Sequence, residues 1–174
     1  MGLLELIRGR LVRVGLTATD KHGVIAELVD FMIAEGAVPA QARAAVMRAV
    51  WGRERFMSTG MEHGIALPHG VTDAVPEEIA AIGIAPQGVA FESFDGQPTT
   101  IVILLLTPTL KALTRVRTLA EIVRVVGDPA VRRRMVTAPD REAVLQVLRQ
   151  ASGRQGTGWR HPERQAGEQG QDAG

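Results

Sequence analysis

Three short apolar runs in the middle of the chain constrain its fold more than any other feature. Residues 64–67, 79–85 and 100–106 are rich in Ile, Val, Leu and Ala, and Gly and Pro residues separate them. Apolar runs of this length, bounded by turn residues, are typical of buried strands. The sequence therefore predicts a β-sheet at the centre of the protein.

Segments with helical periodicity lie on both sides of these runs. Before them, apolar residues at helical spacing predict a helix that is capped by Asp20 and stops near Gly36, and a second helix that begins at Pro39. After them, Leu110, Leu113, Val116, Leu119 and Val123 predict one apolar helix face. Two shorter helices are predicted to begin near Pro129 and near Asp140.

The order helices, strands, helices lacks a strict strand–helix alternation. It therefore predicts an α/β fold in which a mixed central β-sheet is flanked by helices on both faces. We expect one domain over residues 1–152. Residues 153–174 are rich in Gly and Gln and almost devoid of apolar residues, so we expect them to form a disordered tail.

Composition excludes several classes of function. Four Phe, two Trp and no Tyr leave few rings on which single-stranded nucleic acid could stack, and 20 basic residues nearly balance 19 acidic ones. We therefore expect no nucleic-acid partner. The absence of Cys rules out a thiolate nucleophile or thiolate metal site. No signal peptide and no apolar run of about 20 residues is evident, so we expect a cytoplasmic protein without direct membrane insertion.

His69 is the leading candidate for chemistry. It lies in GIALPHG, where Pro68 ends a predicted strand and Gly70 follows without a side chain. This order would deliver the imidazole at a strand end with room for an approaching group, which suits a nucleophile. From the local pattern alone, an idle histidine in a polar turn is the favoured interpretation, because a single His is a weak signal.

The stretch before His69 could bind an anion. Arg53 offers a fork of N–H donors, and the Ser58, Thr59 and Gly60 turn could point hydroxyl and backbone N–H groups at a phosphoryl group. The alternative for Arg53 is a solvated side chain near the end of a helix, where the helix dipole favours a cation.

Taken together, three stretches resemble one known family. The sequence RERFMSTGMEHGIALPHG, followed by AFESFDGQPTTIVILLLTP and TLAEIVRVV, closely resembles enzyme IIA of the fructose/mannitol class in the bacterial phosphoenolpyruvate-dependent phosphotransferase system. That class includes nitrogen-regulatory members. The resemblance runs from about Arg10 to Arg149. It implies the fold of that family, a mixed sheet between helices, and a phosphoryl-accepting histidine at the position of His69.

The resemblance implies partners and a reaction. In this family the histidine takes a phosphoryl group from the phosphohistidine of HPr, or of a nitrogen-related HPr, and passes it to a IIB domain. A neutral imidazole nitrogen suits the attack on phosphorus, and its second nitrogen should be held by an acceptor. The scheme requires neither cofactor nor metal. We expect a phosphotransferase that works as a free-standing IIA module and donates to a separate IIB domain in sugar uptake.

One departure from the family bears on this function. Members commonly carry a second histidine in a His-Leu-x-x-Leu-Ala pattern, and aligning Leu119 and Ala120 puts Arg115 at that position. Arg115 could pair with the phosphoryl dianion and slow its release, or it could turn outward from a less efficient site. His63 is an auxiliary candidate that could replace the missing ring, or it could be a surface-loop histidine.

Two further functions remain as alternatives. The first is a regulatory binding module, similar to the nitrogen-regulatory members, whose phosphorylation state alters its affinity for a target protein without onward transfer. The second is a metal-binding or hydrolytic domain built from His63, His69 and carboxylates. The sequence disfavours the second, because it has neither H-E-x-x-H spacing nor a thiolate cluster.

Overall fold

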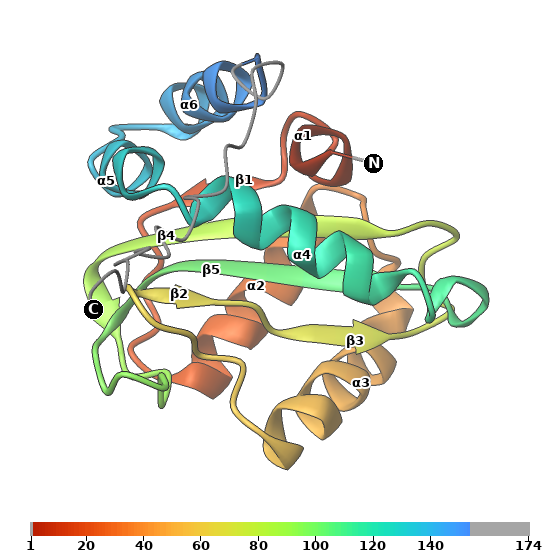
Figure 1. The fold of residues 1–174 in the computed structure, drawn as a ribbon. Coiled ribbons are helices and arrows are strands. Elements are labelled where there is room, and N and C mark those ends of the chain that lie inside the picture. Colours follow the sequence, from red (N-terminus) through yellow and green to blue (C-terminus); the bar gives the residue numbers. More distant parts are fainter. Residues whose placement is uncertain (1, 154–174) are drawn as a thin grey trace, which may run out of the picture.

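A central sheet between two helical layers makes up residues 2–153, the part of the chain described by this computed structural model (Figure 1). The final helix ends at Gly153. The predicted tail, residues 153–174, otherwise lies outside the described residues, as does Met1.

The sheet has five strands in mixed orientation. They are β1 (Val12–Val14), β2 (Ile65–Ala66), β3 (His69–Val71), β4 (Ile79–Val89) and β5 (Thr99–Thr107). The spatial order is β1-β4-β5-β2, and β3 also pairs with β5. The β4–β5 pair is antiparallel and the other pairs are parallel, which confirms the predicted mixed sheet.

β2 and β3 act as two halves of one interrupted edge strand. Both run parallel to β5, with Ile65 opposite Ile101 and His69 opposite Leu105. The interruption falls at Pro68, whose carbonyl still accepts a hydrogen bond from the Leu105 amide at 3.0 Å. The four-residue offset along β5 separates the start of β2 from His69 by about 13 Å, at the usual rise of a strand.

Helices cover both faces of the sheet, as predicted (Figure 1). One face carries α2 (Lys21–Ala34) and α3 (Arg43–Phe56), which follows the short 3₁₀ turn η1 (Ala40–Ala42). The other face carries α1 (Leu3–Leu6), α4 (Arg115–Val126), α5 (Pro129–Val136) and α6 (Arg141–Gly153). A second 3₁₀ turn, η2 (Thr109–Lys111), connects β5 to α4.

Local capping signals set the starts of three helices. The Asp20 carboxylate accepts from the Gly23 amide at 2.8 Å, and Asp128 and Asp140 cap α5 and α6 in the same way. Such side-chain acceptors satisfy amides that have no partner inside a helix. The helix starts predicted near Asp20, Pro129 and Asp140 are confirmed.

The prediction that the apolar helix face begins at Leu110 is wrong, because Leu110 and Leu113 precede the helix. α4 begins only at Arg115, and the side chains of Leu110 and Leu113 are 99% and 97% exposed. The buried face of α4 comprises Thr118, Ile122, Val125 and Val126. Regular spacing of apolar residues therefore predicted a helix correctly, but not its start or the side that packs on the sheet.

The core consists almost entirely of aliphatic side chains. Phe91 is the one aromatic residue among the buried hydrophobic side chains of residues 2–153. No helix within these residues has both the length and the apolar character needed to cross a membrane.

Candidate functional site

His69 begins β3 at the edge of the sheet, and its side chain is largely recessed. The residue is 7% exposed, and its Nδ1 lies 2.8 Å from the Leu67 carbonyl oxygen. A carbonyl can only accept a hydrogen bond, so Nδ1 carries the proton in the neutral ring and Nε2 keeps a free lone pair. The backbone on the other side of Pro68 thus supplies the acceptor that the sequence did not name.

The surroundings of His69 keep its ring neutral. Burial lowers the pKa of His69 below the ordinary value of 6.5, and the positive charges of Arg53 and Arg115 lower it further. The hydrogen bond to Leu67 and the negative charge of Glu54 act in the opposite direction. The balance lowers the pKa, which favours the neutral imidazole at pH 7.

Two guanidinium groups, one from each helical layer, lie close enough to His69 for their charges to lower its pKa. Arg53 lies in the last turn of α3 and donates from Nη1 to the Met57 carbonyl at 2.8 Å. Arg115 is the first residue of α4, and its side chain forms no hydrogen bond or ion pair with other residues in the described range 2–153. The structure therefore brings together His69, Arg53 and Arg115, three of the predicted site residues.

A buried ion pair braces the end of α3. The Glu54 carboxylate is 3% exposed, accepts from both the amide and the hydroxyl of Thr59, and lies 3.2 Å from Lys21 Nζ. Lys21 also pairs with Glu92 at 2.7 Å. Neither Lys21 nor Glu54 is predicted from the sequence as a site residue, because no local pattern distinguishes them from surface charges.

The Ser-Thr-Gly turn is occupied by contacts within the protein. The Ser58 hydroxyl donates to the Phe91 carbonyl at 3.0 Å, and the Gly60 amide donates to Ser58 Oγ at 3.2 Å. Both donors of Thr59 bind Glu54. The expectation that this turn points its donors at an anion is therefore not met. The turn instead packs against the loop that contains Phe91.

Gly70 has a different role from the one expected. A Cβ atom at Gly70 would lie 2.9 Å from the backbone nitrogen of Val50 on α3. Such a distance is shorter than real Cβ contacts, so glycine is required for the close approach of α3 to β3. The missing side chain makes room for a helix and not for a ligand.

A second buried carboxylate fixes the start of α4. Glu78 is 7% exposed and accepts hydrogen bonds from Thr107 Oγ1 at 3.3 Å and Thr118 Oγ1 at 2.7 Å. Thr118 lies one turn after Arg115 on α4. Glu78 therefore ties the helix turn that carries Arg115 to the ends of β4 and β5.

Exposed apolar side chains occur on the two segments that carry Arg53 and Arg115. Phe56 ends α3 and Met57 follows it. Leu110 lies on η2, Val116 on the first turn of α4, and Leu113 in the turn between them. We call these five residues the apolar rim; all are exposed, Phe56 to 86%. Met61, the other methionine near the site, is half-buried against the core.

The structure does not bring His63 to His69. His63 precedes β2, its amide binds the Asp95 carboxylate at 2.9 Å, and its ring borders a cavity of about 340 Å³ with Arg132 and Arg133. The offset along β5 separates this region from His69. Replacement of the missing family histidine by His63 therefore has no support in this geometry.

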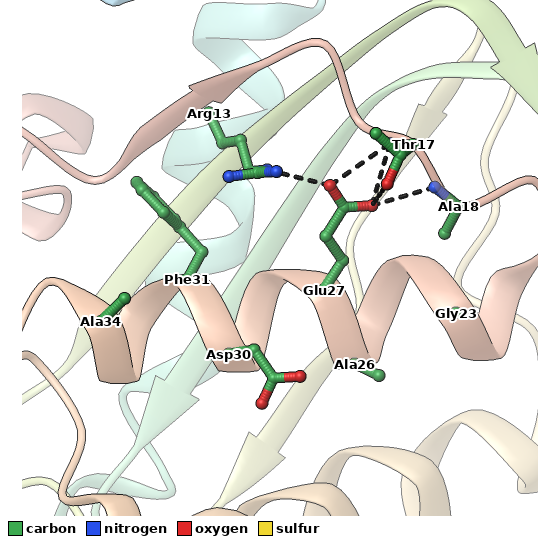
Figure 2. A pocket seen from close by; sticks show the side chains of 9 residues that line it. All are labelled: Arg13, Thr17, Ala18, Gly23, Ala26, Glu27, Asp30, Phe31 and Ala34. Atoms are coloured by element: carbon green, nitrogen blue, oxygen red, sulfur yellow. Dashed lines mark hydrogen bonds and ion pairs between the residues drawn. The ribbon is translucent and has the colours of Figure 1, made fainter.

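The larger cavity described, about 560 Å³, lies between α2 and the loop after β1 (Figure 2). Its carboxylates are already paired. Glu27 accepts from Arg13 at 2.9 Å and from the amides of Thr17 and Ala18, and Asp30 binds Arg43. His69 borders neither cavity. Within residues 2–153 no cluster of His, Asp and Glu could hold a metal ion.

Comparisons with known proteins agree with the fold and with the family resemblance of the sequence. The family model "Phosphoenolpyruvate-dependent sugar phosphotransferase system, EIIA 2" matches residues 5–151. The chain is 27% identical over 150 residues to the fructose-specific EIIABC component of Bacillus subtilis, covering 86% of this chain but only 23% of that protein. It is also 27% identical over 148 residues to a nitrogen regulatory protein of Bradyrhizobium diazoefficiens, covering 85% and 95% of the two chains.

Solved structures show the same fold. The nitrogen regulatory protein IIA-Ntr from Neisseria meningitidis superposes with a TM-score of 0.73 at 22% identity, covering 83% of this chain and 97% of that one. Enzyme IIAMTL of Escherichia coli, in its complex with phosphorylated enzyme IIBMTL, gives a TM-score of 0.67 at 20% identity, covering 80% and 94%. The protein belongs to the type 2 EIIA family of the phosphoenolpyruvate-dependent sugar phosphotransferase system.

Proposed function

We propose that the protein is a phosphocarrier that holds a phosphoryl group transiently on His69. The donor is the phosphohistidine of HPr or of a nitrogen-related HPr, and the acceptor is a separate IIB domain. The observation that carries the proposal is a neutral imidazole whose Nδ1 is bound to Leu67 and whose pKa is lowered by burial and by the charges of Arg53 and Arg115. Such a carrier, exchanging phosphoryl groups between proteins, would work in the cytoplasm.

The transfer step needs no metal and no proton relay. The Nε2 lone pair of His69 forms a bond to phosphorus while the P–N bond of the donor breaks, and that electron pair returns to the donor imidazole. The Nδ1 proton of His69 stays on its hydrogen bond to Leu67. Transfer to the IIB domain repeats the exchange in the other direction. Positioning and charge stabilisation supply most of the catalysis in such reactions.

Arg53 and Arg115 would stabilise the transferred group. A phosphoryl group on Nε2 carries about two negative charges, and guanidinium forks match its oxygen atoms well. Arg53 is held in place by the Met57 carbonyl, whereas Arg115 has its donors free within the described residues. Ser58, Thr59 and Gly60 contribute indirectly, because they shape the loop that follows Arg53.

The apolar rim would dock the partner proteins. Exposed apolar side chains on both sides of a recessed reactive group fit a surface that partners cover transiently. One face must serve donor and acceptor in turn, since both have to reach the same imidazole. Met57 can adapt to two partners because its side chain is flexible and exposed.

A regulatory module is the second candidate function, and Arg115 favours it. A guanidinium that pairs with the bound phosphoryl group stabilises the loaded state and slows discharge. A long-lived phosphorylated state suits a switch that other proteins read. The relatives include proteins named for fructose uptake and for nitrogen regulation.

Intact mass tests the shared part of both proposals. The protein is incubated with phosphoenolpyruvate, enzyme I and HPr, and the mass of the intact protein is then measured. We expect a gain of one phosphoryl unit that is labile to acid, lost in His69→Gln and retained in His63→Gln.

Transfer of radiolabel separates the two proposals. Radiolabel that moves from the protein to an added IIB domain supports the relay, whereas label that stays on His69 supports the switch. An unmodified wild-type mass would overturn both.

A further inference from the structure

The two segments that carry Arg53 and Arg115 are basic as well as apolar. They are residues 52–57, at the end of α3, and residues 109–117, over η2 and the start of α4. Their cations are Arg53, Arg55, Lys111, Arg115 and Arg117. Over the whole chain 20 basic residues nearly balance 19 acidic ones, so the excess on these segments is a local asymmetry.

Carboxylates on the same segments are scarce and already bound. Glu54 is their single acidic residue, and it is buried against Thr59 and Lys21. Asp73 borders η2, where its two oxygens accept from the amide and the hydroxyl of Thr109 at 2.9 and 3.0 Å. The free charges on these two segments are therefore all positive.

The arrangement also selects for a protein partner of a certain shape. α3 and α4 lie on opposite faces of the sheet, with the β3 edge between them (Figure 1). His69 is largely buried, while the apolar rim is exposed on segments from both helical layers. A convex protein surface that carries its reactive group at the summit fits this profile.

We propose that the phosphoryl-donor protein presents acidic side chains around its phosphohistidine. This inference rests on the proposed phosphocarrier function and adds the charge of the partner to it. Opposite charges on two docking faces raise the rate of encounter, whereas like charges on an incorrect partner are repelled. The basic face thus selects among HPr-like donors before any contact is made.

Two donors that differ only in charge test the inference. One HPr is prepared with acidic substitutions, and one with basic substitutions, on the exposed residues around its phosphohistidine. At low salt we expect the acidic donor to load His69 about tenfold faster, and the two rates to converge near about 1 M salt, where charges are screened. Equal rates at low salt, or faster loading by the basic donor, would overturn the inference.

Charge-reversal variants of this chain show which residues produce the preference for the acidic donor. Lys111→Glu combined with Arg117→Glu should abolish the preference for the acidic donor. Arg133→Glu, on the exposed side of α5, makes the same kind of charge reversal away from the site and should leave the preference intact. A preference that survives the double substitution would place its origin elsewhere on the chain and so contradict the inference.

A small donor separates this inference from the phosphocarrier proposal. Phosphoramidate carries a transferable P–N phosphoryl group but has no docking face, so its loading of His69 should show no dependence on Lys111 or Arg117. If phosphoramidate phosphorylates His69 but the basic protein donor reacts faster than the acidic one, the inference about the partner's charge is wrong and the phosphocarrier proposal stands. Failure of every donor to phosphorylate His69 would instead remove the proposed function.

Discussion

Arg115 opposes His69 from the first turn of α4, close enough for its charge to lower the pKa of the imidazole. No described residue pairs with its guanidinium, so a phosphoryl group on His69 would be its natural partner. Arg115→Gln should shorten the lifetime of the phosphorylated protein about fivefold, equivalent to about 1 kcal/mol for a half-exposed ion pair. Acid-quenched radiolabel decay measures that lifetime. Arg117→Gln is the matched control, and equal decay in both variants would exclude a role for Arg115.

The hydrogen bond between His69 Nδ1 and the Leu67 carbonyl predicts which nitrogen is modified. Because Nδ1 is engaged as a donor, the phosphoryl group should bond to Nε2. Nitrogen-15 NMR of the phosphorylated protein distinguishes the two isomers through the ring nitrogen shifts. Modification at Nδ1 would require this hydrogen bond to break and would contradict the geometry described.

The lowered pKa of His69 predicts a dependence of stability on pH. Between its lowered value and the ordinary 6.5, the unfolded chain binds a proton that the folded protein does not. The free energy of unfolding should therefore fall as the pH drops through this window and recover above it. Glu27 and Asp30 also have lowered pKa values, but their effects lie at more acidic pH.

Urea denaturation from pH 7.5 downward measures this contribution. His69→Gln should flatten the curve in the window just below pH 6.5, while its more acidic part keeps the wild-type slope. An unchanged slope in the variant would show that His69 titrates alike in the folded and unfolded states.

The close packing of α3 on Gly70 predicts that one added methyl group lowers the stability of the protein. Gly70→Ala would force a Cβ to within 2.9 Å of the Val50 backbone, so α3 and β3 would have to move apart. We expect the free energy of unfolding to fall by about 1–3 kcal/mol. Gly52→Ala, in α3 and with nothing within 4 Å, should instead stabilise by about 0.5–1 kcal/mol. Chemical denaturation compares the two, and equal effects would contradict the packing described.

The hydrogen bond from Thr118 to Glu78 predicts that two substitutions of Thr118 differ in their effect on stability. Thr118→Val removes the hydroxyl that donates to the buried carboxylate at 2.7 Å, so the protein should lose about 1–3 kcal/mol of stability. Thr118→Ser keeps the donor and should cost much less. Thermal or urea unfolding measures both variants. A valine variant as stable as the serine variant would show that the hydrogen bond contributes nothing.

Some elements could be predicted from the sequence because their signals are local. An aspartate that caps a helix acts on amides two or three residues away, so Asp20, Asp128 and Asp140 reveal helix starts without any tertiary information. β1 and β3 have only three residues each and exist because they pair with β4 and β5. Such strands have no period of their own to detect.

The groups of the candidate site likewise fall into those that the sequence identifies and those that only the tertiary structure shows. His69 and Arg53 stand out by residue type, and the family resemblance directs attention to Arg115. The Leu67 carbonyl is a backbone atom, which every residue possesses, so nothing in the sequence identifies it as the acceptor. Leu110 and Leu113 show a further limit, because periodicity reports which residues share a helix face and not whether other chain segments cover it.

The break between β2 and β3 has one further consequence. The group that orients the imidazole is main chain, so no point mutation at position 67 can delete it in the way a side-chain carboxylate can be deleted. The tautomer of the neutral ring is therefore set by the backbone of the loop. Side-chain substitutions that leave this backbone in place leave the tautomer unchanged.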